Sequence, residues 1–440
     1  MPPQPRPWFT RPRPWLLLLL GCTVVASAAR AAPPAFDPVA ETEKLIQTLP
    51  AEVRAKSAAY FEGGYIIQVW NLLLGLVIAW LLLKCGVTVK LRDLAERWFK
   101  GRYLPGVLFI ALFAVISTVL DLPNDYYVGF IREHRFGLSN LTTAGWLGEQ
   151  AKGLLVALIG FSLVGSLLYL GIRKSPPRWW VRASLATPFF IIFLQVLAPV
   201  FVAPLFNKFT PLADAKVRDP ILSMARANGV PVDNVYQFDA SKQTRRISAN
   251  VSGALHPIRV SLNDNLLNRC TPEEVQAVMG HELGHYVLNH IYKGVVFFAL
   301  LYAAGFWFTH WFFGAVHRRL GAGWGLRGID DFAGLPLFLA GFSVFMFLAS
   351  PVRNTLIRTN EVEADLFGLN AAREPDAFAH VALQLSEYRK LAPGKWEEII
   401  FFDHPSGYQR ILMSMRWKAE HFAELPDVCW PDRPGRTAVK

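Results

Sequence analysis

Long apolar runs separated by short polar loops dominate the hydrophobic pattern of this chain. A helix that crosses the hydrocarbon core of a membrane needs about 20 mostly apolar residues. Six internal stretches reach or approach that length: about 65–83, 104–120, 154–172, 184–206, 294–316 and 332–352. Prolines within 184–206 do not exclude a span, because neighbouring helices can satisfy the carbonyls that a proline frees. The pattern predicts a mainly α-helical, multi-pass membrane bundle rather than a soluble domain with buried core helices.

A seventh and shorter apolar run covers residues 15–29. It follows three arginines and leads into a series of small residues. A basic start, a short apolar run and small residues are typical of a cleavable signal sequence. The same run also fits a first membrane helix that is retained. We therefore expect residues 1–31 to be either a signal sequence or a first membrane helix, and the whole chain to have six to seven spans.

The composition supports a membrane protein and excludes a disordered chain. The 440 residues are 52% hydrophobic and only 18% charged, whereas soluble domains carry about 25% charged residues. The net charge of +11 does not indicate nucleic-acid binding, because the sequence has no long run of Lys and Arg. Four cysteines lie far apart without a CxxC pair. They predict neither a zinc ribbon nor a disulfide framework.

The positive charge is concentrated in three loops that separate apolar runs, at 84–103, 173–183 and 317–331. With all seven runs counted as crossings, these loops and the basic N-terminus lie on one side of the membrane. The positive-inside rule makes that side cytoplasmic. The remaining polar segments, including 207–293 and 353–440, are then expected on the opposite side.

The strongest chemical motif is His281-Glu282-Leu-Gly-His285. A capping box from Thr271 and Glu274 predicts a helix that starts just upstream and runs through the motif. Histidines four residues apart leave the same face of a helix and can bind one metal ion, for which zinc is well suited. Glu282 can take a proton from a metal-bound water. An HExxH motif also occurs by chance in unrelated helices, so the motif alone leaves the function open.

A catalytic zinc site needs a third protein ligand, and Glu361 follows directly after the last apolar run. Two predicted crossings separate it from His285, which returns the chain to the same side. Glu361 and Asp365 share a helical face. We expect Glu361 to bind the metal and Asp365 to accept a hydrogen bond from His281, fixing its tautomer. Glu363 points elsewhere and is expected at the surface. A solvated acidic turn is the alternative interpretation.

Taken together, these motifs resemble the M48 family of membrane metallopeptidases, and especially its Ste24 branch, the CAAX prenyl endopeptidases. Four further segments are similar to characteristic stretches of that branch: 130–137, 203–212, 239–250 and 404–410. The matches occur in order over about 65–415. The resemblance implies a bundle of membrane helices that encloses a water-filled chamber, a zincin-type HExxH helix and a small β-sheet.

The resemblance also implies roles for the polar residues of the site. One zinc ion per chain would be held by the two motif histidines and Glu361, with Glu282 as the general base. His404 would stand near the scissile carbonyl, where an imidazole can stabilise a developing oxyanion. Arg410 would brace the site. An ordinary loop histidine and a salt-bridged helix arginine are the alternatives. His290 follows the motif by five positions, off the ligand face, and is expected to be structural.

Residues 247–262 are rich in β-branched side chains and are interrupted by a glycine and a proline. This pattern predicts two short strands. In metallopeptidases of this kind an edge strand pairs with the substrate backbone. Ala249 and Asn250 would lie on that edge and bind substrate, although a structural role at a turn fits Asn250 equally well. The 239–250 stretch departs from the branch in its serine, histidine and aromatic content, so substrate specificity is left open.

We therefore predict an integral membrane zinc endopeptidase that acts on membrane-associated or CAAX-type protein or peptide substrates, lipidated ones among them. Membrane lipids are the other expected partner, and nucleic acid is not. The N-terminal membrane domain is expected at 32–206 and the catalytic domain at 207–440, which includes two membrane helices at 294–316 and 332–352. An inactive scaffold of the same family and a multi-pass transporter are the alternatives. The intact motif disfavours the scaffold, and the scarcity of charge in the crossings disfavours the transporter.

The charge count and the family resemblance predict opposite orientations. The resemblance places the active site on the cytosolic side, as in the eukaryotic enzymes. The positive-inside count places it on the other face. Together with the signal-like start, the count favours a bacterial-type inner membrane with a periplasmic catalytic face. Turnover of membrane proteins or lipoproteins would then be the task rather than CAAX processing.

Overall fold

The structure is a computed structural model in which residues 36–253 and 258–421 are described. The expected signal sequence or first membrane helix at 1–31 lies outside the described residues. Everything below concerns the unit that begins at Pro38. Its first eight α-helices are α1 (Pro38–Gln47), α2 (Ala51–Lys84), α3 (Val87–Trp98), α4 (Leu104–Tyr126), α5 (Arg132–Phe136), α6 (Thr143–Lys174), α7 (Trp179–Leu197) and α8 (Ala203–Phe206).

The second half of the chain contains the sheet and the remaining helices. The strands are β1 (Phe209–Pro211), β2 (Val232–Phe238), β3 (Ala249–Ser252) and β4 (Ile258–Asn263). The helices are α9 (Ala215–Ala227), α10 (Asp264–Arg269), α11 (Pro272–Val287), α12 (His290–Val316), α13 (Leu335–Leu348), α14 (Ser350–Ala372), α15 (Pro375–Leu385), α16 (Lys395–Phe401) and α17 (Gly407–Glu420).

Five helical stretches within the described residues are long and apolar enough to cross a membrane. They are Ala51–Lys84, Leu104–Phe136, Thr143–Lys174, Pro176–Phe206 and His290–Gly321. The sixth predicted run, 332–352, does not form one straight helix. The pair Phe332–Leu348 and Ser350–Ala372 passes the same test together but is bent by 54°. The bend occurs where Pro351 follows Ser350 at the start of α14, a position that suits proline because the first amides of a helix have no partner there.

One helix continues well beyond the apolar run that predicted it. The helix that begins at Leu104 passes through a π-helical turn, Tyr127–Ile131, into α5. The 130–137 segment is therefore the end of a long helix and not a separate loop. It stops at Gly137, whose φ of 76° is the left-handed conformation that ends many helices. Polar residues in this last part mark where the helix leaves the apolar layer.

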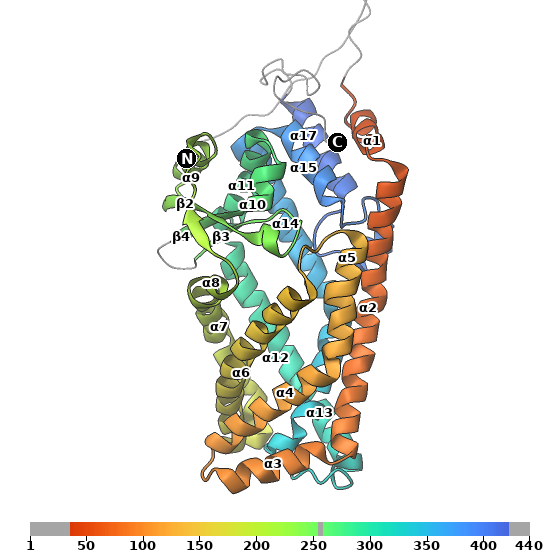
Figure 1. The fold of residues 1–440 in the computed structure, drawn as a ribbon, viewed down its shortest axis with the longest axis vertical. Coiled ribbons are helices and arrows are strands. Elements are labelled where there is room, and N and C mark those ends of the chain that lie inside the picture. Colours follow the sequence, from red (N-terminus) through yellow and green to blue (C-terminus); the bar gives the residue numbers. More distant parts are fainter. Residues whose placement is uncertain (1–35, 254–257, 422–440) are drawn as a thin grey trace, which may run out of the picture. The chain divides into compact units, whose positions relative to one another are not determined.

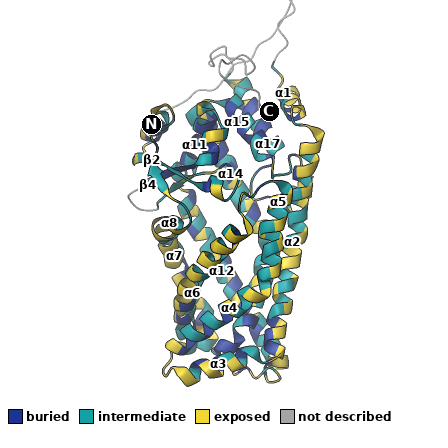
Figure 2. Cartoon of the chain, in the orientation of Figure 1, coloured by how far each residue is buried: buried dark blue, intermediate teal, exposed yellow. Residues whose placement is uncertain are grey.

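The surface of the bundle is apolar in the way that a lipid environment requires. Phe161, Leu185 and Phe189 are each about 70% exposed on α6 and α7. Figure 2 shows exposed residues along α2, α6 and α7, and buried residues around α11, α15 and α17 and at the end near α3. Large exposed apolar patches are rare on soluble proteins and mark surfaces that another apolar phase covers. The multi-pass membrane bundle predicted from the sequence is thus the observed architecture.

The basic loops gather at the end of the bundle that lies away from the sheet. Figure 1 shows α3 and the start of α13 at one end, with β2, β4 and α11 at the other. A buried ion pair holds the basic end together: Arg92 Nη1 on α3 lies 2.7 Å from Asp331 Oδ2, just before α13. This ion pair joins α3 to the segment before α13 at the basic end of the bundle.

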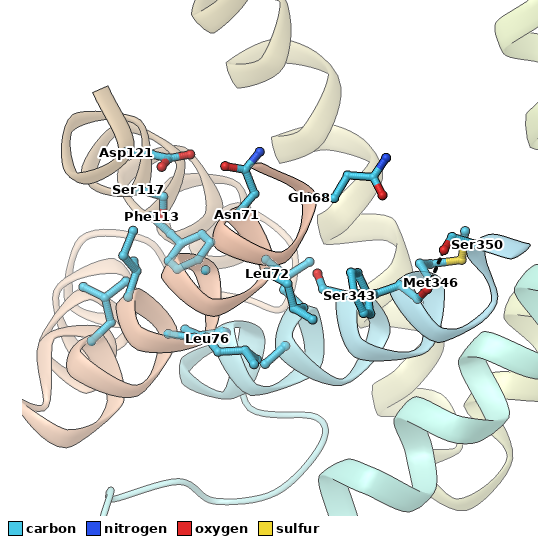
Figure 3. A pocket seen from close by; sticks show the side chains of 18 of the residues that line it. Gln68, Asn71, Leu72, Leu76, Phe113, Ser117, Asp121, Ser343, Met346 and Ser350 are labelled. Carbon is cyan, nitrogen blue, oxygen red and sulfur yellow. Dashed lines mark hydrogen bonds between the residues drawn. The ribbon is translucent and has the colours of Figure 1, made fainter. Parts of the chain in front are cut away.

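A cavity of about 580 Å³ lies between α2, α4 and α13. Gln68, Asn71, Ser117, Asp121 and Ser343 are among the residues that line it (Figure 3). Polar side chains within membrane helices face the bundle interior or water, because lipid cannot satisfy them. Apolar residues such as Leu72, Leu76 and Phe113 line the rest of the cavity, and the water-filled chamber stays a prediction.

The sheet has the strand order β1-β2-β4-β3, with β2 parallel to β4 and β3 antiparallel to β4. The two strands predicted within 247–262 are β3 and β4. Helix α11 packs on the sheet through Met279 and Leu283, which join Val235, Val260 and Leu262 in one fully buried cluster. Each such side chain stabilises the fold by about 1.5–3 kcal/mol through burial. This packing fixes the opposite face of α11, which carries the histidines.

Candidate active site

Helix α11 starts at the capping box that the sequence predicts. Thr271 Oγ1 accepts a hydrogen bond from the Glu274 amide at 3.4 Å, and Glu274 Oε2 accepts one from the Thr271 amide at 2.9 Å. The helix then runs without interruption to Val287. His281 and His285 consequently lie one turn apart on the same face.

A close contact between glycines brings α14 against α11. A Cβ atom added to Gly280 would lie 3.0 Å from the Gly368 carbonyl oxygen, and one added to Gly368 would lie 2.7 Å from the His281 amide nitrogen. The distance at Gly368 is shorter than a Cβ atom tolerates and the one at Gly280 is very tight, so glycines at both positions permit this approach. The close packing brings the carboxylates of Glu361 and Asp365 within reach of the histidines.

Three potential ligand atoms converge between these two helices. Nε2 of His281 and Nε2 of His285 are 3.1 Å apart. Glu361 Oε2 lies 3.3 Å from the first nitrogen, and Glu361 Oε1 lies 3.4 Å from the second. All three ligand atoms lie within 4.8 Å of one another, an arrangement that could hold a metal ion. Glu361 Oε2 is buried and accepts no hydrogen bond from the described residues, so a cation would satisfy an otherwise unpaired oxygen.

Asp365 holds His281 through the ring nitrogen Nδ1. Its Oδ1 lies 2.7 Å from His281 Nδ1, the contact that the helical spacing predicts. Arg410 Nε on α17 donates to Asp365 Oδ2 at 2.9 Å, and Arg410 Nη2 donates to Oδ1. In a neutral His281 whose Nδ1 donates to Asp365, Nε2 carries the lone pair that a metal ion would need. Arg410 thus orients the carboxylate that holds His281, and it also lines the cleft beside Glu282 and His404.

Glu282 lies beside the histidines and lines a cleft of about 230 Å³. Burial raises the pKa of its carboxyl to about 7, with Glu361 adding to the increase and His281 opposing it. A carboxylate with a pKa near neutrality is a more effective proton acceptor than an exposed one. Glu282 therefore has both the position and the basicity of a general base.

His404 reaches the same site from the segment between α16 and α17. Its Nε2 lies 3.4 Å from Glu361 Oε2, and its Nδ1 lies 2.8 Å from Asp403 Oδ1. His404 also lines the cleft next to Glu282. The structure thus brings this residue, separated from the HExxH motif by more than 100 positions, to the ligand cluster.

Strand β3 is an edge strand and forms part of the cleft wall. Ala249 lines the cleft together with His281 and Glu282. Asn250 is exposed and is not among the lining residues, because successive side chains of a strand point to opposite faces. Of the two predicted substrate-binding residues, the structure therefore brings Ala249 to the catalytic groups and leaves the Asn250 side chain outside the cleft.

Sequence reasoning did not predict that His290 contacts the second motif histidine, His285. His290 Nδ1 lies 2.9 Å from His285 Nδ1, and His290 Nε2 lies 3.0 Å from Glu363 Oε2. Glu363 is 43% exposed, as expected for a surface residue. The expectation that His290 lies off the ligand face assumed that the HExxH helix continues past residue 287. It ends there instead, and Asn289 adopts a left-handed φ of 58° before α12 begins. An asparagine after an apolar helix is a recognised stop signal and could have indicated the break.

Comparisons with known proteins support the same interpretation. Residues 30–208 match the family model of the CAAX prenyl protease N-terminal region, described as five membrane helices, and residues 211–415 match that of Peptidase family M48. The uncharacterized metalloprotease YhfN of Bacillus subtilis (strain 168) is 30% identical over 380 residues, which cover 85% of this chain and 89% of YhfN. The chain belongs to peptidase family M48. It is an integral membrane metalloendopeptidase of the Ste24-like type, so the predicted family and enzyme class are confirmed.

Other relatives carry names that refer to prenylated substrates. CAAX prenyl protease 1 of Saccharomyces cerevisiae is 35% identical over 199 residues, which cover 43% of this chain and 42% of the yeast protein. The Dictyostelium discoideum homolog is 30% identical over 293 residues, 63% of this chain and 66% of its own length. The crystal structure of Ste24p from S. mikatae has a TM-score of 0.70 over 85% of this chain and 93% of that one, at 23% identity. This structural match confirms the predicted fold class.

Proposed function

We propose that the chain is a zinc-dependent endopeptidase with one zinc ion per chain, held by His281, His285 and Glu361. The observation that carries the proposal is the convergence of these three ligand atoms within 4.8 Å, with one buried carboxylate oxygen left unpaired among the described residues. Two imidazoles and a carboxylate are a common donor set for catalytic zinc, which keeps a fourth position open. A bound zinc ion supplies a Lewis acid that polarises the scissile carbonyl and acidifies water.

The remaining side chains perform the proton transfers and hold the substrate. Glu282 takes a proton from the attacking water and later passes it to the leaving amine nitrogen. His404 lines the same cleft, and as an imidazolium it can pair with Asp403 through Nδ1 and donate a hydrogen bond from Nε2 to the carbonyl oxygen as negative charge develops. Asp365 orients His281, and Arg410 neutralises Asp365. Glu282, Asp365 and Arg410 are held by helices α11, α14 and α17, and His404 by the short segment between α16 and α17.

We propose that the substrate binds as an extended strand along β3. Among the described strands, β3 pairs only with β4, so its other edge offers backbone groups to a peptide. Ala249 and Asn250 lie on that edge, next to the cleft and exposed to solvent respectively. Backbone pairing would align the scissile bond with Glu282. Because it does not depend on side chains, it would accept substrates of many sequences.

We propose proteins and peptides associated with the membrane as the substrate class, lipidated ones among them. The names of the relatives in yeast and Dictyostelium support CAAX-type substrates. The basic loops at the end of the bundle remote from the site favour a bacterial-type inner membrane with a periplasmic catalytic face, which would exclude cytosolic prenylated proteins. Lipoproteins and misassembled membrane proteins are substrates that a periplasmic active site could reach.

The test compares peptide cleavage by the purified full chain with that of Glu282→Gln. Glutamine keeps the shape of the side chain but cannot accept a proton, so kcat should fall about 100- to 10,000-fold. Bound zinc, measured by elemental analysis, should stay near one per chain in both proteins. Peptides with and without a prenylated cysteine, and peptides from lipoproteins, distinguish the substrate classes.

The matched control is Glu273→Gln, the same change in the first turn of α11, outside the residues that line the cleft. It should cleave at the wild-type rate. Equal cleavage by wild type and Glu282→Gln would refute the role of Glu282. A wild-type protein that binds zinc but cleaves no peptide would instead favour a scaffold of the same family.

A further inference from the structure

We propose that His290 and Glu363 form a positioning relay for the second metal ligand, fixing the tautomer of His285 so that its Nε2 lone pair faces the metal. This inference rests on the proposed metal site. It assigns a function to two residues that act only through His285 and do not themselves reach the proposed metal position.

The tautomers of His290 and His285 follow from two consecutive hydrogen bonds, starting at Glu363. Glu363 is a carboxylate that can only accept, so His290 Nε2 must donate the proton across their 3.0 Å contact. Nδ1 of a neutral His290 then carries a lone pair. That nitrogen lies 2.9 Å from His285 Nδ1, which must therefore donate. Nε2 of His285 is left unprotonated, as metal binding requires.

The two liganding histidines are thus supported in different ways. His281 donates directly to a carboxylate, Asp365, whereas His285 reaches a carboxylate through a second imidazole. Histidine ligands generally donate their other ring N–H to a carboxylate, carbonyl or water, which fixes the ring and raises its basicity. Without His290, His285 would have no such acceptor among the described contacts of its Nδ1.

The break between α11 and α12 creates this contact. On a continuous helix, five residues correspond to about 500°, so His290 would leave at roughly 140° from His285. Asn289 has a φ of 58°, and α12 begins in a new direction with His290 as its first residue. The His290 side chain is 4% exposed and packs beside the ring of His285, with ring centroids 5.0 Å apart.

Glu363 comes from α14, two positions after Glu361. Two positions on a helix differ by about 200°, so the two carboxylates leave different faces and contact different histidines. Lys293, one turn after His290 on α12, donates to Glu363 Oε2 at 2.7 Å and keeps the carboxylate in place. Glu363 is 43% exposed, so it can be replaced with little disturbance of the buried core.

The test measures metal affinity of the full-length chain in detergent, after chelator treatment, by competition of Zn²⁺ with a chromophoric chelator. His290→Ala should weaken binding about 10- to 100-fold, the usual effect of removing such a partner. Glu363→Ala should weaken it in the same direction. The double variant should bind no more weakly than His290→Ala alone, because the carboxylate acts only through the imidazole. His290→Asn should recover part of the affinity, since its amide oxygen can accept from His285 Nδ1.

A control variant and the Co²⁺ spectrum distinguish a positioning role of His290 from a structural one. His317→Ala, at the far end of α12, should keep wild-type affinity. The Co²⁺-substituted wild type should show d–d absorption that shifts in His290→Ala and not in His317→Ala. Wild-type affinity in both single variants, or losses that add in the double variant, would refute the relay while leaving the proposed function intact. A wild-type protein that binds no Zn²⁺ would refute the proposed metal site itself.

Discussion

At the scale of single residues, the proposed ligand set follows from side-chain chemistry and helical spacing. The sequence predicts that His281 and His285 share a face and that Asp365 meets His281, and the structure has both arrangements. The contact between His285 and His290 could not be obtained in the same way. Helical spacing assumes that a helix continues, and the left-handed Asn289 interrupts it. Local backbone breaks redirect side chains that periodicity places elsewhere.

Glu282 predicts a pH dependence of the reaction. Burial raises the pKa of its carboxyl to about 7, and a nearby divalent cation, which favours the ionised form, would lower that value. Since only the ionised carboxylate accepts a proton, kcat/KM should increase with pH along an acid limb whose midpoint lies below 7. The pH profile of peptide cleavage measures this midpoint. Bound zinc must be followed over the same range, because loss of metal would mimic the limb. Activity that increases on acidification would contradict this role.

At the scale of elements, the site depends on how closely α11 and α14 pack. Glycines at 280 and 368 permit the approach, yet a sequence does not reveal which glycines face a partner helix. The bend between α13 and α14 was missed for a related reason. A hydropathy window joins apolar residues on both sides of a break, and here the polar residues of α14 carry the chain away from the apolar layer towards the site.

Replacement of Gly368 by alanine tests this packing. The added Cβ would lie 2.7 Å from the His281 amide nitrogen and should force the helices apart. We expect destabilisation of about 1–3 kcal/mol, as for other overpacked cores, and weaker zinc binding. Thermal unfolding in detergent and zinc content measure the two effects.

The matched control is Gly64→Ala on α2, where an added Cβ meets nothing within 4 Å. A helix gains about 0.5–1 kcal/mol from this change when space allows. If Gly368→Ala behaved like Gly64→Ala in both measurements, the glycine contact would not determine the geometry of the site.

At the scale of the whole molecule, the sequence predicts a membrane bundle with a metal motif at one end. Composition and the length of the apolar runs are enough to predict the bundle, because the lipid core of a membrane requires both. The chamber was expected only from the family resemblance, since no local pattern reveals a cavity between helices. The division into domains at 32–206 and 207–440 stays a prediction, and so does the orientation.

Cysteine labelling tests the orientation. Cys85 is exposed next to α3, at the basic end of the bundle, whereas burial raises the pKa of the Cys270 thiol to about 12 and makes it unreactive. In a variant with Cys22 and Cys429 replaced by serine, an impermeant maleimide should label Cys85 in inverted membrane vesicles but not in intact bacterial cells. Lys216→Cys on α9 should show the opposite pattern. The reverse result would place the catalytic face in the cytosol.

The most direct test of the central claim is X-ray absorption at the zinc K edge of the purified chain loaded with one equivalent of zinc. The account predicts two imidazole nitrogens at about 2.0–2.1 Å and a carboxylate oxygen at about 2.0–2.2 Å, without sulfur. Glu361→Gln should lose the carboxylate while both imidazoles stay. Fewer than two imidazoles in the wild type, a sulfur ligand, or a spectrum unchanged by Glu361→Gln would contradict it.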